Sequence, residues 1–158
     1  MKTPRKDLYQ SFRNSAFQSS RAELGLPPTS APTQAWGVVM DWGLPEGTAT
    51  VVAFSDGNAR VYLSNGGGPM VGASPESIRK AAKEMVAIAA QYRPPTYVAT
   101  DYPLPRRAQV IFYFLTDAGI FTAGAAQAEL SPLSRLGDAA RDIITQHVSS
   151  NGNNSVES

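Results

Sequence analysis

Residues 48–92 read TATVVAFSDGNARVYLSNGGGPMVGASPESIRKAAKEMVAIAAQY, and this stretch decides the fold. An apolar, β-branched run at 49–54 is followed by an Asp-Gly pair (56–57) and a second apolar run at 60–63. Because an Asp-Gly pair tolerates the positive φ angles of a tight turn, the pattern predicts a β-hairpin. After a glycine-rich loop, apolar residues recur every three or four positions from 75 to 92, which predicts a helix packed on the sheet.

The segment 110–115 reads VIFYFL and is apolar at every position. A half-solvated strand would alternate apolar and polar residues, so this pattern predicts a central strand that is covered on both faces. We expect Phe112 and Phe114 to lie on the opposite face from Ile111 and Tyr113. The other expected elements are a helix that starts at Pro4, strands at 35–42, 96–100 and 120–124, and a last helix at 132–148.

The composition divides the chain into three parts. Residues 1–34 read as a basic N-terminal helix with a proline-rich linker, residues 35–148 as a single α+β domain, and residues 149–158 as a polar, disordered tail. The N-terminal helix offers only a thin apolar stripe, made of Leu8, Phe12 and Ala16. We therefore expect that residues 1–30 and the tail can be removed without unfolding the domain.

Overall charge and residue usage exclude several classes of function. The net charge of +1 argues against a broad polyanion-binding surface, so nucleic-acid binding is not favoured. The absence of cysteine excludes disulfides, thiolate metal sites and a cysteine nucleophile, and His147 is the only histidine, so we expect no metal and no cofactor. The N-terminal residues lack an apolar signal core, and no apolar run approaches the ~20 residues of a membrane span. We expect a cytoplasmic protein that does not bind membranes.

One tryptophan and four short stretches resemble the profilin-like folds, which include profilins and the roadblock dynein light-chain modules. They are Trp36, 39–41 (VMD), 51–57 (VVAFSDG), 61–64 (VYLS) and 75–78 (PESI), and the resemblance covers about residues 35–148. It implies an antiparallel sheet of five to six strands with helices on both faces. The chain departs from profilin at 36–42, where it reads as a strand rather than a helix, so no actin-binding surface is carried over.

One group of candidate ligand-binding residues lies on the loop that follows the expected strand at 96–100. The loop is stiffened by prolines, and it carries both charges and aromatic rings. Loops carry binding residues more often than core elements do, and adjacent arginines suit an acidic or phosphorylated partner. The candidates are Tyr97, Asp101, Tyr102, Arg106 and Arg107.

A second group of candidate residues precedes the helix at 75–92, where glycines and a serine are spaced nearly as in a phosphate-binding loop. The position that such a motif gives to lysine is Ala73, and Pro69 removes one backbone donor. Free N–H groups at the start of that helix could still hold an anion. The anion-binding candidates are Gly67, Gly68, Gly72 and Ser74.

The sequence leaves two functional hypotheses from different classes. The first is a non-enzymatic protein-interaction module that forms a homodimer, or binds another protein, through the uncharged edge strand at 96–100 or the outer face of the helix at 75–92. The second is a small-molecule-binding domain or small enzyme with a pocket near the loop at 97–107. We favour the first because no nucleophile–base pair can be identified in the sequence.

Overall fold

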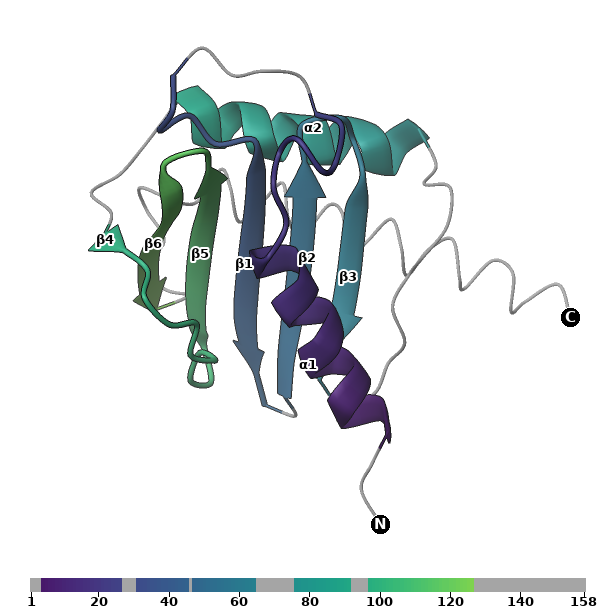
Figure 1. Ribbon diagram of the computed structural model, residues 1–158. Coiled ribbons are helices and arrows are strands. Elements are labelled where there is room, and N and C mark those ends of the chain that lie inside the picture. Colours follow the sequence, from purple (N-terminus) through teal and green to yellow (C-terminus); the bar gives the residue numbers. More distant parts are fainter. Residues whose placement is uncertain (1–3, 27–30, 46, 65–75, 92–96, 127–158) are drawn as a thin grey trace, which may run out of the picture.

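A computed structural model describes residues 4–26, 31–45, 47–64, 76–91 and 97–126 (Figure 1). The helix expected at 132–148 and the tail expected at 149–158 lie outside these residues. The described elements, in chain order, are α1 (Pro4–Phe17), β1 (Gly37–Leu44), β2 (Gly47–Phe54), β3 (Ala59–Leu63), α2 (Glu76–Gln91), β4 (Tyr97–Val98), β5 (Gln109–Thr116) and β6 (Gly119–Ala126).

The strands form one six-stranded sheet in the order β3-β2-β1-β5-β6-β4. Each neighbouring pair in that order is antiparallel. Pairing of β1 with β5 joins the β1-β2-β3 meander to the β5-β6 hairpin, and it places β5 in the middle of the sheet. The α+β class and the five- to six-stranded antiparallel sheet are confirmed, whereas the profilin-like label stays a prediction.

Turn chemistry produces the hairpin that the Asp-Gly pair predicts. Gly57 has a φ of +95°, a backbone conformation that L side chains rarely adopt. The Asp56 carboxylate accepts a hydrogen bond from the backbone N–H of Asn58 at 2.9 Å, which stabilises the turn between β2 and β3. Gly119, with a φ of +131°, serves the turn between β5 and β6 in the same way.

One face of the sheet packs against α2, which lies across β1, β2 and β3 (Figure 1). Alternate residues of β5 belong to this side: Phe112 and Phe114 are 0% and 2% exposed and join the cluster that contains Met85 of α2. Tyr113 belongs to the cluster on the other face, and Ile111 packs against that cluster. The predicted division of β5 between two covered faces is therefore confirmed.

The opposite face packs against α1 (Figure 1). Phe12 and Ala16 of the predicted stripe do face the sheet, but the inward surface is wider, because Tyr9, Arg13 and Phe17 are also buried. Their spacing of four residues, repeated from Tyr9 to Phe17, places these side chains on one side of the helix. The expectation that residues 1–30 can be removed is thus opposed by the structure, although the domain boundary at residue 34 stays a prediction.

A buried polar network attaches α1 to the sheet. Arg13 and Asp41 are 3% and 0% exposed, and the Arg13 guanidinium Nη2 lies 2.6 Å from Oδ2 of Asp41. The Thr50 hydroxyl donates to Oδ1 of Asp41 at 2.6 Å, and the Tyr9 hydroxyl lies 2.7 Å from the Thr50 oxygen. Because the single Thr50 hydroxyl hydrogen is used on Asp41, the Tyr9 hydroxyl is the donor to Thr50.

The first prediction concerns the central strand. Replacing Phe112 by alanine should lower the free energy of unfolding by about 3–5 kcal/mol, because the fully buried ring leaves a cavity in the cluster beneath α2. Urea denaturation followed by circular dichroism measures the loss. Lys80→Ala, at an exposed site on α2, is the control and should change stability by less than about 0.5 kcal/mol. A loss below about 1 kcal/mol for the Phe112 variant would contradict the packing of β5.

The second prediction concerns α1. Deletion of residues 1–17 should abolish cooperative unfolding, because it exposes one apolar face of the sheet and leaves the buried Asp41 carboxylate without its cation. Thermal melts measured by circular dichroism test this. A matched truncation of the polar segment 149–158 should leave the melting temperature of the full chain nearly unchanged. If the first truncation melted cooperatively at the full-length temperature, α1 would be dispensable.

Candidate functional site

The loop from Ala99 to Ala108, termed the β4–β5 loop, connects the edge strand β4 to the central strand β5 (Figure 1). Its middle is fixed by aromatic contacts. The Tyr102 ring stacks on Phe17 of α1 with a centroid distance of 4.0 Å and an angle of 3°. The hydroxyl of Tyr113 donates a hydrogen bond of 3.2 Å to the carbonyl oxygen of Pro103. The loop is therefore held against both α1 and β5.

Backbone contacts fix the far end of the same loop. The N–H of Gln109 donates to the carbonyl of Arg106 at 3.0 Å, and the N–H of Ala108 donates to the carbonyl of Gly43 at 2.9 Å. Ala108 has a φ of 63°, in the left-handed region that disfavours residues with a Cβ by roughly 1–2 kcal/mol. A Cβ at position 43 would overlap the Arg106 carbonyl oxygen, so β1 needs glycine where the loop crosses it.

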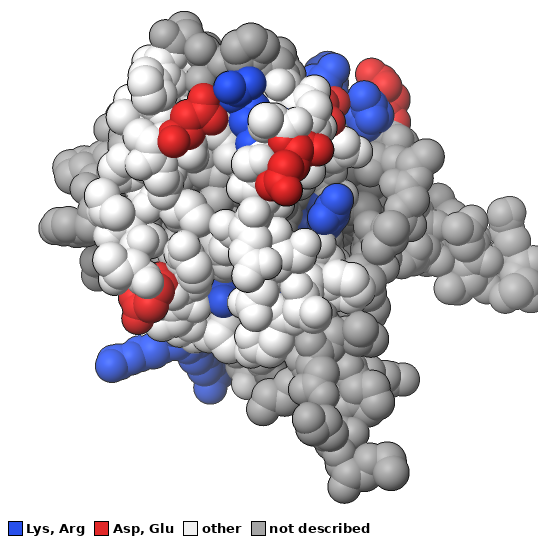
Figure 2. All heavy atoms as spheres, viewed as in Figure 1, with Lys and Arg blue, Asp and Glu red and all other residues white. Residues whose placement is uncertain are grey.

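The large or charged side chains that these anchors leave exposed on the loop are those of Asp101, Leu104, Arg106 and Arg107. Leu104, at 42%, and Val98 on the adjoining β4, at 65%, are the exposed large hydrophobic residues within the described part of the chain. Figure 2 shows acidic and basic atoms near each other at the lower left of this face, over the β4–β5 loop. The loop thus combines exposed apolar area with both signs of charge.

The predicted ligand-binding residues occupy this one segment of the chain. Tyr97 lies on β4 opposite Thr122 of β6, which places it at the edge of the sheet. Asp101, Arg106 and Arg107 are exposed, whereas Tyr102 is half-buried and its ring is used to anchor the loop. Their role in binding stays a prediction. The sequence did not reveal the anchors of this segment, Phe17 and Tyr113, because nothing local signals a contact between rings so distant in sequence.

The predicted anion-binding residues Gly67, Gly68, Gly72 and Ser74 lie outside the described residues, as does His147, and their roles stay predictions. Within the described ranges, no group of three or more His, Asp or Glu side chains is arranged to hold a metal ion. No described helix is both long enough and apolar enough to span a membrane. The cytoplasmic location expected from the sequence stays a prediction.

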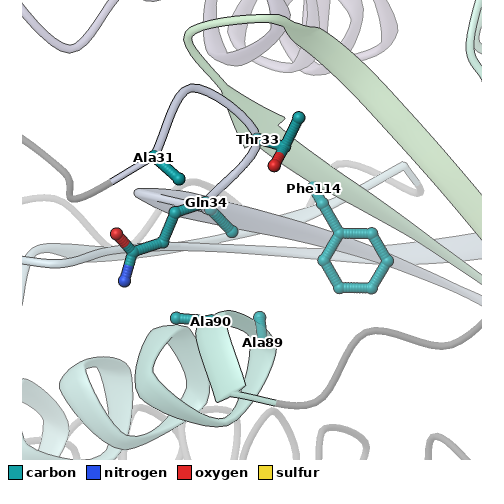
Figure 3. A pocket seen from close by; sticks show the side chains of 7 residues that line it. Ala31, Thr33, Gln34, Ala89, Ala90 and Phe114 are labelled. Atoms are coloured by element: carbon teal, nitrogen blue, oxygen red, sulfur yellow. The ribbon is translucent and has the colours of Figure 1, made fainter.

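A cavity of about 270 Å³ lies beside the end of α2, away from the β4–β5 loop (Figure 3). Ala89 and Ala90 of α2 present only methyl groups there, and the ring of Phe114 from β5 forms another wall. These small side chains of α2 leave space above β5. The lining is completed by the segment that leads into β1: Ala31, Thr33, Gln34 and Ala35.

Comparison of the chain with protein-family models, with curated proteins and with solved structures finds no match.

The third prediction concerns alkaline pH. Burial, with the negative charge of Asp41, raises the pKa of Tyr9 and of Tyr113 from 10.0 to about 12 each. Between pH 10 and 12 these phenols ionise in the unfolded chain before they ionise in the folded one. In this range the folded state binds more protons than the unfolded state. The contribution of the two phenols to the free energy of unfolding is therefore fully present below pH 10 and is lost as the pH rises toward 12.

Urea titrations at fixed pH values from 8 to about 12 measure this decline, and Tyr9→Phe, which removes one of the two buried phenols, should flatten it. A free energy of unfolding that stays constant up to pH 12 would contradict the burial of these hydroxyls.

Proposed function

We propose that this chain is a non-enzymatic protein-interaction module that forms a homodimer through the β4–β5 loop and the adjoining β4 edge. The supporting observation is the position of the exposed apolar side chains: Val98 and Leu104, the exposed large hydrophobic residues of the described ranges, both lie in this short segment. Exposed apolar area that is rimmed by polar groups is typical of protein-interaction sites.

The end position of β4 supports the same proposal. Among the described strands β4 has one neighbour, β6, and the segment 96–100 carries no charge that would block pairing with another chain. The strand has only two residues, so backbone pairing contributes little, and the side chains of the loop must supply most of the contact. By comparison, the outer face of α2 exposes Lys80, Lys83 and Glu84, the composition of an ordinary solvated helix face.

The anchoring of the β4–β5 loop favours binding energetically. A mobile loop loses conformational entropy when it is ordered by a partner, which offsets part of the contact energy. Here the stacking of Tyr102 on Phe17 and the hydrogen bonds at Pro103 and Arg106 order the loop before any partner arrives. A two-fold symmetric contact is the commonest way for such a surface to be covered by a second copy of the same chain.

A small-molecule-binding domain is the second candidate, and the cavity beside α2 is the observation that favours it. Its volume of about 270 Å³ lies close to the lower end of the ~300–1,000 Å³ range of ligand sites, and its walls include apolar groups from α2 and β5. The cavity is lined by none of the candidates at 97–107, where the sequence located the pocket. We rank this function second because the described part of the cavity lining contains no charged side chain.

The fourth prediction tests the homodimer. Sedimentation equilibrium from about 1 to 100 μM should show a monomer–dimer equilibrium for the full chain. Leu104→Lys combined with Val98→Lys should shift it toward monomer by at least about tenfold in dissociation constant, because two charges would be buried at the contact. Ala87→Lys, at an exposed site on α2, is the matched control and should leave the equilibrium unchanged. A monomer mass across the whole range would remove the homodimer and favour the cavity.

A further inference from the structure

The exposed side chains of the β4–β5 loop follow an order along the chain that indicates how two copies would meet, an inference that rests on the proposed homodimer. An acidic residue, Asp101, comes first, the apolar Leu104 lies in the middle, and the basic Arg106 and Arg107 come last. All four are exposed, while Tyr102 between them turns inward onto Phe17. If a second copy of the loop is placed against the first in the reverse direction, the acidic end of each copy meets the basic end of the other.

We propose that two copies of the chain pair their β4–β5 loops about a two-fold axis close to Leu104, with Asp101 of each copy facing Arg106 and Arg107 of the other. In a symmetric contact of this kind, every residue that touches a second residue is touched by it in return. One acid–base match therefore occurs twice, once on each side of the axis. The two Leu104 side chains cover each other at the centre.

The charges of the loop are available for this pairing. The described ion pairs join Arg13 to Asp41 and Arg21 to Asp117. Within the described residues, Asp101, Arg106 and Arg107 form no ion pair of their own, although the backbone N–H of Arg106 is bound to Gln109. A guanidinium presents a planar fork of donors that matches a carboxylate, so adjacent arginines are well suited to receive Asp101 of a second copy.

The geometry of the loop fits the same arrangement. Five residue steps from Asp101 to Arg106 span at most about 17 Å, and Leu104 lies near the midpoint of this segment. The ends of the charged stretch are fixed separately, by Tyr102 and Pro103 on one side and by the turn at Ala108 on the other. With the net charge of the chain at +1, two copies approach without strong overall repulsion, so the local match decides the orientation.

Charge reversal tests the proposal with three variants of the full chain. Asp101→Arg leaves the loop with positive charges only, and Arg106→Asp with Arg107→Asp leaves it with negative charges only. Each variant alone should dimerise at least about tenfold more weakly than the wild type, because like charges then face each other twice. An equimolar mixture of the two should recover dimer as a heterodimer, and the triple reversal should recover the homodimer.

Sedimentation equilibrium measures all of these equilibria, with circular dichroism to verify that each exposed-site variant is folded. Lys83→Glu on α2 is the control and should dimerise like the wild type. If the reversal variants dimerise as tightly as the wild type, or if the mixture stays monomeric, the charge pairing is wrong while the homodimer stands. A wild type that is itself monomeric up to 100 μM would overturn both proposals.

Discussion

The buried ion pair between Arg13 and Asp41 is the interaction on which the rest of the structure depends. Both side chains are almost entirely removed from water, and their closest approach is 2.6 Å. Burial alone lowers the pKa of Arg13. The hydrogen bonds and the negative charge of Asp41 together raise it by more than burial lowers it, so the pKa of Arg13 lies above its ordinary value. A carboxylate at the centre of β1 is tolerable only with its cation present, and therefore α1 has one position on the sheet.

The position of α1 in turn determines the surface that we propose as the interface. The Arg13 guanidinium lies 5.0 Å from the centroid of the Phe17 ring, and that ring carries Tyr102 of the β4–β5 loop on its face. Tyr113 completes the arrangement by contacting both rings and the Pro103 carbonyl. Contacts thus run from the buried charge to Tyr102 and Pro103, the loop residues that precede the exposed Leu104.

Local patterns predicted the sheet well, because they act over a few residues. The apolar runs gave the strands, the Asp-Gly pair gave its turn, and the unbroken run of β5 gave a strand covered on both faces. The ion pair that attaches α1 to the sheet could not be predicted from such local patterns. Arg13 reads as a solvated base on a polar helix, and its partner lies 28 positions away on β1. Likewise, the loop at 97–107 was identified by its charges, but the role of Tyr102 as an anchor depends on Phe17, on a distant helix.

A double-mutant cycle on the buried pair tests this account most directly. Arg13→Met and Asp41→Leu, alone and together, would be compared by urea denaturation. We predict that each single variant loses about 3–5 kcal/mol and that the double variant loses clearly less than either, because two apolar side chains leave no unpaired buried charge. Additive losses, with a coupling energy below about 0.5 kcal/mol, would show that α1 is held by its other contacts and would contradict the account.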